Sequence, residues 1–513
     1  MPLIRLAAGP DGFPSPVTGV RLAGIQASLV FDTLVWKSPS GAIAGWLARS
    51  WQESADGTTW TFTLHPGVTW QDGTPMTAAD VAFTYNYLIS GPGHAAAGIF
   101  GSVFIGDFVG VTAPDASTVV FQFKRPWAPF LTNIAGLVLI LPQHIWSTVT
   151  NPATFTGSSS MVGTGPYRLA SFDRATGSAD FVANDRYFMG PPKVRRIEFV
   201  PAPDPLLSLK QGDIDAANLY TEDQLPTEVL TSFSPSKYGT VTGTSDWDRA
   251  LYFNLDAGFP YNNVTFRQAV DDAVNRPALV STVLFGHGMP GSSGGLAPSN
   301  PYFAPGLPAD NFDPTGADSL LDSIGLTRPA GGGMRQLPGG HPFTVTLQTS
   351  TEFSNETAQL VAEDLHAVGL AVDVDQLDAT TADKNAATGN YQMALVGTAG
   401  PGEDPDLLLR INLSPKTIAT TSKSWGYDNP TVETLGNDEL FSPSMAARTA
   451  DFRQIQQAVA DDVPFIPLYF PTPEAIFNKT VFDQWYFTPG GFRANATGVL
   501  NKAVFVTGRK GGV

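Results

Sequence analysis

Residues 47–85, LARSWQESADGTTWTFTLHPGVTWQDGTPMTAADVAFTY, form the most strongly patterned stretch of this 513-residue chain. From Thr59 to Leu64, large apolar residues alternate with threonines, a period of two that predicts a strand with one buried face. Asp-Gly pairs on both sides of the strand region are turn signals. Thr77 stands three residues before Asp80, a spacing typical of a capping box at the start of a helix. The stretch therefore predicts a strand, turn, strand, helix unit, and it contains no catalytic, metal-binding or phosphate-binding motif.

The composition limits the class of protein. A chain of 513 residues exceeds one compact core, so two or three domains are expected. The net charge of −17 opposes binding to nucleic acid or to anionic lipid. The absence of cysteine excludes disulfides, thiolate catalysis and cysteine-ligated zinc. No apolar run reaches the ~20 residues that a membrane-spanning helix needs.

The wording of residues 47–85 resembles the signature of the family 5 extracellular solute-binding proteins, which deliver peptides, nickel and other solutes to ABC importers. Further stretches resemble the family in the same order along the chain: FDTLVW at 31–36, GTGPY at 163–167, NDRYF at 184–188, GDID at 212–215 and RQAV at 267–270. The resemblance extends over residues 20–490, nearly the whole chain.

This resemblance implies an α/β, two-lobed fold of the type II periplasmic-binding-protein kind, with an extra subdomain in the first lobe. It places lobe I at residues 1–246 and 485–513, with the inserted subdomain at about 46–160. Lobe II is expected at 247–484, with a ligand cleft and a hinge between the lobes. A strand-helix-strand pattern at 343–374 indicates a parallel sheet in lobe II. Residues 126–141 are expected to form a helix and an apolar run closed by Pro142.

The resemblance also implies a function. We expect an extracytoplasmic, monomeric protein that captures a small polar solute and delivers it to an ABC permease in the membrane. It would act in the periplasm or as a lipid-anchored protein on the outer face of the cytoplasmic membrane. Residues 1–5 lack the charged and apolar regions of a signal peptide, so a leader is expected to be absent from this sequence.

Two ligand classes stay open. A peptide comes first because the family mostly carries peptides. An oligosaccharide or another neutral metabolite is the alternative, since Trp247, Trp425 and Tyr427 could stack on sugar rings and charged residues are sparse at 15%.

The resemblance places the ligand contacts on both lobes. The expected contacts are Arg21, Gly24 and Gln26 in lobe I, and Trp247, Thr398, Gly400, Glu403, Asp404, Trp425 and Tyr427 in lobe II. Peptide-binding members carry a tryptophan and an ammonium-binding aspartate where this chain has Thr398 and Pro401. Because a desolvated ammonium needs an anionic partner, Glu403 is the candidate substitute for that aspartate.

Other chemistry finds little support. Gly291–Gly295 fits G-x-S-x-G, but Pro290 precedes the motif and Leu296-Ala297-Pro298 follows it. A nucleophile elbow requires a helix after the serine, so a loop is favoured over a hydrolase using Ser293. The six histidines do not stand at metal-ligand spacing, which disfavours a metal site. A nickel carrier that holds a chelated metal through few protein contacts stays open as an alternative. We therefore expect no catalytic residue, no metal site and no cofactor.

Overall fold

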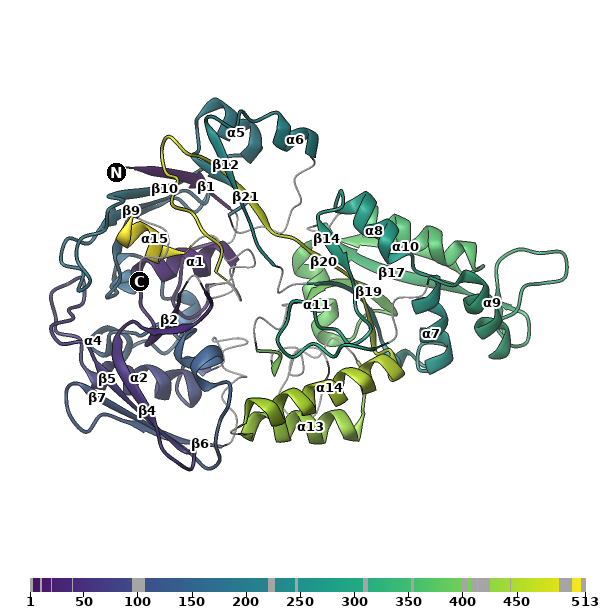
Figure 1. Cartoon of the computed structure of the whole chain (residues 1–513), viewed down its shortest axis with the longest axis horizontal. Helices are drawn as coiled ribbons and strands as arrows, with labels where there is room; N and C mark the ends of the chain where they lie inside the picture. Colours follow the sequence, from purple (N-terminus) through teal and green to yellow (C-terminus); the bar gives the residue numbers. More distant parts are fainter. Residues whose placement is uncertain are drawn as a thin grey trace. The chain divides into compact units, whose positions relative to one another are not determined.

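The computed structural model of the chain falls into two compact units (Figure 1), which are described separately. Unit 1 comprises Met1–Asp223, Thr227–Thr244 and Pro473–Val513, and unit 2 comprises Gln224–Pro226 and Ser245–Thr472. The structure describes residues 3–9, 12–19, 21–38, 40–94, 107–219, 227–244, 248–307, 312–351, 355–398, 404–406, 413, 425–442, 444–488 and 501–508, with only the backbone at 21, 227, 228, 397 and 398.

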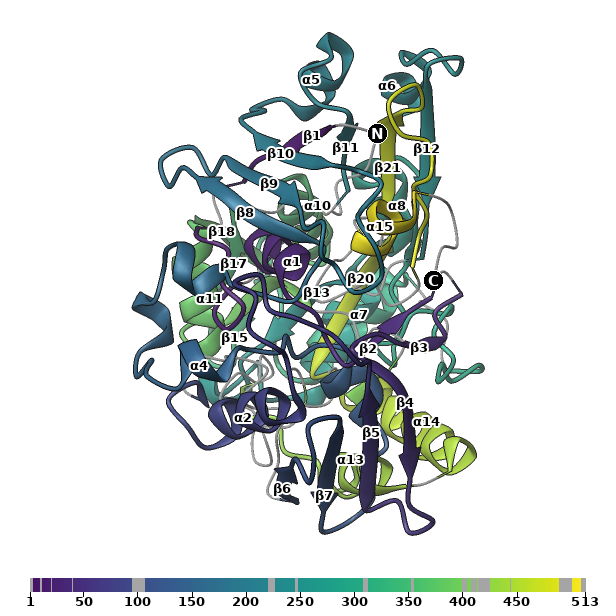
Figure 2. The same ribbon diagram turned by 90° about the vertical axis from the view of Figure 1, so that its left-hand side faces the viewer.

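Unit 1 contains a seven-stranded sheet (Figure 2). Its strands, in spatial order, are β12 (Tyr238–Thr242), β21 (Glu474–Asn478), β11 (Ala216–Ala217), β1 (Ile4–Ala7), β10 (Arg196–Val200), β9 (Ala179–Ala183) and β8 (Tyr167–Phe172). β1 is parallel to both β10 and β11, whereas the remaining pairs are antiparallel. The helices of this unit outside the smaller sheets are α1 (Arg21–Val30), α5 (Pro205–Gln211), α6 (Thr227–Thr231) and α15 (Lys502–Thr507).

The return of the chain to unit 1 occurs earlier than expected. β21 lies within the segment that was expected in lobe II, yet its backbone pairs with β12 along all five residues and with β11 at Ile476 and Phe477. These ladder bonds place residues 474–478 in the sheet of unit 1, so the boundary lies at 472/473 and not at 484/485.

The patterned stretch at 47–85 forms part of a second sheet in unit 1. This antiparallel sheet has the order β4 (Ala48–Glu53), β5 (Thr59–Leu64), β7 (Thr118–Phe123), β6 (Phe108–Thr112), and α2 (Ala78–Ile89) follows β5 in the chain. Trp60, Phe62 and Leu64 of β5 are buried, which confirms the predicted strand. The Thr77 N–H donates to the Asp80 carboxylate at 2.8 Å, as the capping box predicted.

Smaller elements complete unit 1. β2 (Val35–Lys37) and β3 (Ile43–Gly45) form a hairpin, and α4 (Gln143–Trp146) follows the second sheet in the chain. Residues 126–141 were expected to be helical, but only Leu131–Ala135 form a π-helical turn. Pro126 and Pro129 lack the N–H groups that a continuous helix needs, and the apolar residues after Gly136 run on without regular structure into the core.

Unit 2 is built on a six-stranded sheet. Its order is β14 (Gly288–Pro290), β20 (Phe465–Pro471), β13 (Asp248–Phe253), β19 (Met393–Thr398), β17 (Thr344–Ser350), β18 (Ala371–Leu377). β17 is parallel to β18 and β19, and β13 is antiparallel to β19 and β20. The helices are α7 (Val264–Ala273), α8 (Arg276–Val283), α9 (Pro314–Ser323), α10 (Asn355–Ala367), α11 (Ala379–Thr388), α13 (Pro430–Phe441) and α14 (Met445–Asp462). A short hairpin, β15 (Gln336–Leu337) with β16 (His341–Pro342), completes the unit.

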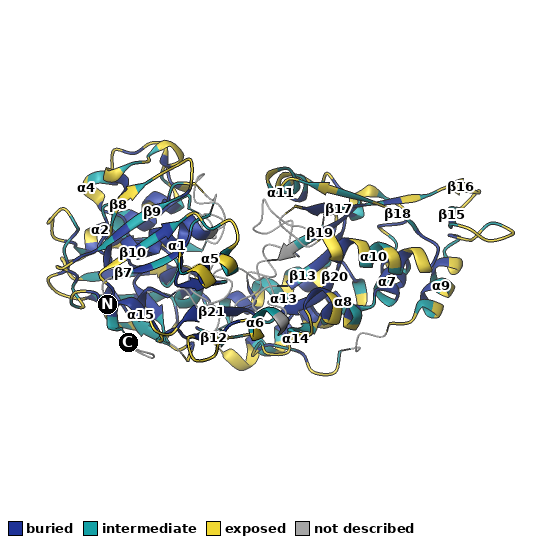
Figure 3. Ribbon diagram, turned by 90° about the horizontal axis from the view of Figure 1, so that it is seen from above, coloured by how far each residue is buried: buried dark blue, intermediate teal, exposed yellow. Residues whose placement is uncertain are grey.

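Helices cover both faces of this sheet (Figure 3). On one face, Val345 and Leu347 of β17 join a cluster with Val361 and Leu365 of α10. On the other face, Ala394 of β19 belongs to a cluster that includes residues of α14. β17 pairs with β18 in parallel, and α10 connects the two strands, which confirms the predicted strand-helix-strand unit. No helix within the described ranges is long and apolar enough to cross a membrane.

Candidate ligand-binding site

The connections of β17 create a switch point at one edge of the unit 2 sheet. α10 leads from β17 to β18 on one side, and α11 leads from β18 to β19 on the other side of β17. Because β17, β18 and β19 are mutually parallel, their carboxyl ends meet at the same edge. In open α/β sheets, the place where the connections diverge is where ligands bind.

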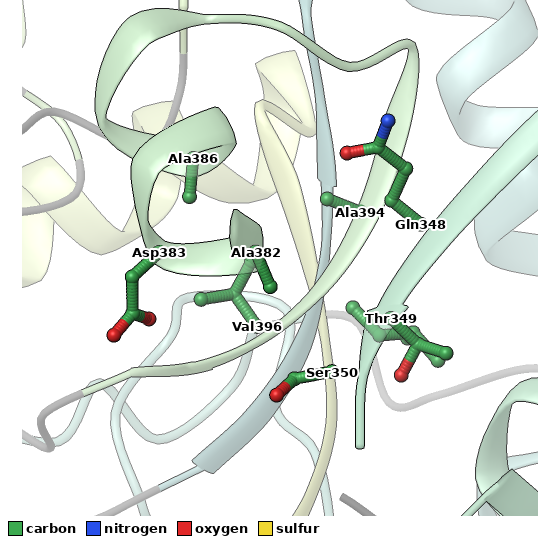
Figure 4. A pocket seen from close by; sticks show the side chains of 9 residues that line it. Gln348, Thr349, Ser350, Ala382, Asp383, Ala386, Ala394 and Val396 are labelled. Carbon is green, nitrogen blue, oxygen red and sulfur yellow. The ribbon is translucent and has the colours of Figure 1, made fainter. Parts of the chain in front are cut away.

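A pocket lies at this switch point (Figure 4). β17, α11 and β19 supply its lining: Gln348, Thr349, Ser350, Ala382, Asp383, Ala386, Ala394, Leu395 and Val396. Its position at the carboxyl ends of two parallel strands makes it a candidate ligand contact among the described residues of this unit.

The pocket exists because α11 presents small side chains to the sheet. Ala382 and Ala386 are four residues apart, so they lie on one side of the helix, and both line the pocket together with Ala394. Methyl groups on both sides leave a gap that longer side chains would fill. Polar contacts keep α11 in place: the Asn385 side chain donates to the Gln348 side chain at 3.2 Å.

Neutral and acidic groups define the pocket chemistry. Strand alternation places the side chains of Gln348 and Ser350 on the same face of β17, and that of the buried Thr349 on the opposite face. Asp383 is exposed and supplies the one charged side chain of the lining. The lining therefore suits a neutral or cationic group better than an anionic group.

The net charge of the chain is concentrated in unit 2. Unit 2 contains 27 acidic and 11 basic residues, a formal charge of −16, whereas unit 1 contains 20 acidic and 19 basic residues. The field around unit 2 consequently attracts cations and repels anions, in agreement with the pocket lining.

The expected lobe I contacts all lie on α1. Gln26 is buried, with 2% of its surface exposed. Gly24 lies close to the backbone of Gly19, since a Cβ at Gly24 would be 2.8 Å from the Gly19 carbonyl oxygen. Arg21 is the first residue of α1, and only its backbone is described.

Of the expected lobe II contacts, Trp425 lies beside the pocket. Its indole N–H donates to the Ala386 carbonyl at 2.8 Å, so the ring packs against the helix that lines the pocket. Thr398 ends β19, and its backbone lies opposite Asp248 of β13. Trp247, Gly400 and Glu403, and also Pro401, lie outside the described residues.

Tyr427 and Asp404 are both buried in polar contacts within unit 2. The Tyr427 hydroxyl donates to the Asp462 carboxylate at 2.9 Å, and burial raises the pKa of the phenol. Both carboxylate oxygens of Asp404 accept hydrogen bonds from Arg448, each at 2.9 Å. The structure thus joins Asp404 to α14 and directs the Tyr427 hydroxyl away from solvent.

Sequence reasoning missed the pocket residues of β17 and α11. The sequence did indicate where to look, because the strand-helix-strand pattern predicted a parallel sheet. The carboxyl end of the first strand of that pattern marks the edge of the sheet where ligands bind. The alanines of α11 give no signal until the side of the helix that faces the sheet is known.

Ser293 lies in a turn. β14 ends at Pro290, and the described residues from 291 to 307 contain turns and no helix. The strand-to-helix turn of a nucleophile elbow is therefore not formed here. Within the described part of the chain, no group of three or more His, Asp or Glu side chains is arranged to hold a metal ion.

Comparison with known proteins relates this chain to transport proteins. The family model for bacterial extracellular solute-binding proteins, family 5 Middle, matches residues 42–419. The nickel-binding periplasmic protein of Escherichia coli is 26% identical over 453 residues, covering 86% of this chain and 84% of that protein.

Two solved structures show the fold. A dipeptide-binding protein from a Pseudoalteromonas species in complex with Met-Leu superposes with a TM-score of 0.82 at 21% identity, covering 96% of this chain and 99% of that one. A mannohexaose-bound periplasmic oligopeptide-binding protein from Thermotoga maritima gives 0.80 at 21% identity, covering 96% and 94%. These likenesses confirm the predicted α/β, type II two-lobed fold class.

Proposed function

The chain belongs to the family 5 bacterial extracellular solute-binding proteins, and from that premise we propose that it captures a peptide and hands it to an ABC importer. The protein acts as a monomer outside the cytoplasmic membrane, in the periplasm or on a lipid anchor. Capture and release leave the solute chemically unchanged, so no catalytic residue is assigned.

The pocket at the carboxyl ends of β17 and β19 is the observation that carries this proposal. Its alanine methyl groups accept a short aliphatic group, and the Gln348 amide offers hydrogen bonds to backbone amides. The acidic charge of unit 2 favours the ammonium end of a peptide over its carboxylate.

We place the ligand between the two lobes, with a hinge that lets them close around it. A ligand that contacts both lobes stabilises the closed state by its differential affinity for that state. The proposed contacts outside the pocket are Arg21, Gly24, Gln26, Trp247, Thr398, Gly400, Glu403, Trp425 and Tyr427.

A neutral oligosaccharide is the second candidate ligand. Two observations favour it: a solved structure of the same fold holds mannohexaose, and Trp425 packs beside the pocket. Aromatic rings bind the apolar faces of sugars through flat contact.

Native mass spectrometry of the purified protein, followed by a thermal-shift screen, tests the proposal. The screen contains dipeptides, longer peptides, manno-oligosaccharides and a nickel chelate. A ligand present at 100 times its Kd stabilises the folded protein by about 2.7 kcal/mol, which raises the melting temperature. We expect peptides to give the largest shift. A shift by oligosaccharides alone would select the second candidate, and no shift from any class would refute a binding role.

A pocket-filling variant tests the location of the site. Ala386→Leu places a larger side chain in the pocket, so we expect at least a tenfold loss of ligand affinity without a lower melting temperature. Ala387→Leu is the matched control, because Ala387 is the next residue of α11 and does not line the pocket. Equal ligand affinity of the two variants would remove the pocket from the site.

A further inference from the structure

Arg448 of α14 is buried at the centre of a polar cluster in unit 2. Its side chain is 5% exposed. The two terminal nitrogens of the guanidinium donate to the two oxygens of Asp404 at 2.9 Å each, a bidentate pair. Nε and Nη2 also donate to Glu439 at 2.9 and 2.6 Å, and Nη1 donates to the Tyr302 hydroxyl at 2.9 Å. The guanidinium thus contacts three side chains from three separate segments of the chain.

The contact to Asp404 fixes a short segment that follows β19 in the sequence. Residues 404–406 are all buried, and the Asp406 N–H donates to the Asp404 carboxylate at 3.2 Å. A bidentate pair sets the orientation of the carboxylate as well as its position, because the planar fork of arginine matches its two oxygens. A lysine in the same place would supply the charge without this orientation.

The same cluster continues to the candidate pocket. The Arg448 guanidinium lies over the rings of Tyr302 and Phe452, 5.4 and 5.7 Å from their centroids. Both rings belong to the apolar cluster that contains Ala394 of the pocket lining, and Trp425 packs against that cluster. Described contacts therefore connect Arg448 to the wall of the pocket.

Stability alone is a poor explanation for such an arrangement. Arg448 is surrounded by the carboxylates of Asp404 and Glu439, and that of Asp406 is close enough to act on Glu439. Removing ionic groups from water costs free energy that their attraction barely repays, and apolar replacements of buried ion pairs are often as stable. What the pair does supply is a fixed geometry.

We propose that Arg448 is a positioning residue of the ligand site: it orients Asp404 and, through Tyr302 and Phe452, the wall of the pocket. Asp404 then serves the ligand through its ion pair and not by direct contact, since its side chain is buried and turned toward Arg448. This inference rests on the proposed function, because it assigns Arg448 to the site that binds the solute.

The test compares two buried arginines of unit 2. Arg448→Lys keeps the charge and removes the bidentate fork. Arg335→Lys is the matched control: Arg335 is 2% exposed and bonds to Asp318, Asp322 and the Val368 carbonyl, which precedes β18 at the edge opposite the pocket. Both variants lower the melting temperature. Only Arg448→Lys is expected to raise the ligand Kd, by tenfold or more, when binding is measured well below both melting temperatures.

The outcomes separate the two proposals. A wild-type protein that binds no member of the ligand screen refutes the proposed function. A wild-type protein that binds a ligand, with Arg448→Lys binding it equally well, overturns the positioning role. Equal weakening by Arg335→Lys also overturns it, because the effect is then one of general stability. Should Arg448→Lys fail to fold, Tyr302→Phe replaces it, with an expected two- to threefold rise in Kd, and an unchanged Kd counts against the proposal.

Discussion

Two buried ion pairs, one in each unit, differ in their balance of charge. In unit 1, Lys502 of α15 and Asp32 are both fully buried and lie 2.6 Å apart. The Lys502 ammonium also donates to the carbonyls of Ser28 and Phe31 at the end of α1. The Asp32 carboxylate accepts further bonds from Trp46 and Thr164, at 2.8 Å each. One cation meets one anion, and uncharged groups supply the other hydrogen bonds.

The Arg448 cluster of unit 2 contains more acid than base. Glu439 is fully buried beside Arg448, with Asp404 and Asp406 nearby. Burial, and then the Asp406 charge, raises the pKa of Glu439 well above its ordinary value, against the opposing effect of Arg448. The raised pKa of Glu439 predicts that the stability of the unbalanced cluster depends on pH.

The largest expected effect comes from breaking the balanced pair. Lys502→Met leaves the Asp32 charge buried without its cation, so we expect a loss of about 3–5 kcal/mol in the free energy of unfolding. Equilibrium urea unfolding measures it. Lys479→Met is the control at an exposed lysine of unit 1 and should change stability by less than about 0.5 kcal/mol. A loss below about 1 kcal/mol in Lys502→Met would show that Asp32 is stable without its partner.

A smaller effect follows from removing one uncharged donor of the same site. Thr164→Val deletes a buried hydrogen bond to the Asp32 carboxylate and keeps the shape of the side chain. Hydrogen bonds to charged groups contribute about 1.5–3 kcal/mol, and urea unfolding should show a loss in that range. An unchanged unfolding midpoint would mean that the remaining donors, among them Trp46 and Lys502, stabilise the buried Asp32 carboxylate without Thr164.

Tyr427→Phe tests another carboxylate of unit 2, that of Asp462 at the end of α14. The variant removes the hydroxyl bond to Asp462, while Asn429 still donates to the same oxygen at 2.6 Å. Because one donor remains, we expect the free energy of unfolding to fall by about 1 kcal/mol, measured by thermal or urea unfolding. Tyr427 is also a proposed ligand contact, but the variant keeps its ring and the hydroxyl is bonded to Asp462, so ligand affinity should stay within twofold. A larger change in Kd would assign the hydroxyl to the ligand.

Glu439→Gln is expected to change the melting temperature least at acidic pH. The variant tests whether the Arg448 cluster differs from the Lys502–Asp32 pair in its dependence on pH. A group whose pKa is raised by folding stabilises the folded state at low pH, and that contribution is lost as the pH rises through the folded-state value. Glutamine cannot ionise, so the variant avoids this loss. We expect the melting temperature of the variant relative to the wild type to increase from pH 5 to pH 8. A difference that is constant across this range would show that Glu439 does not take up a proton on folding.

Local patterns in the sequence predicted much of the fold. The alternation at Trp60, Phe62 and Leu64, the Thr77–Asp80 spacing and the strand-helix-strand pattern at 343–374 each depend on neighbouring residues, and each is confirmed. The helix expected within 126–141 is limited to Leu131–Ala135, because the short apolar run that follows is also compatible with a buried extended segment.

Contacts between distant parts of the chain could not be predicted in this way. Asp32 and Lys502 are 470 positions apart, and no periodicity indicates that they meet. The bond between Arg448 and Asp404 is hidden for the same reason. Of the candidate site, the sequence indicated Trp425 and the parallel strands, but the pocket depends on which side of α11 faces the sheet.

The discontinuity of unit 1 has a consequence for synthesis on the ribosome. Unit 2 is almost one continuous stretch, Ser245–Thr472, whereas the sheet of unit 1 needs β21 and the Asp32 site needs Lys502. The half that is translated first should therefore acquire its native core last, after the other half. Nascent chains stalled before Lys502 should resist protease within unit 2 and be cut within unit 1, and resistance in the reverse order would contradict this sequence of events.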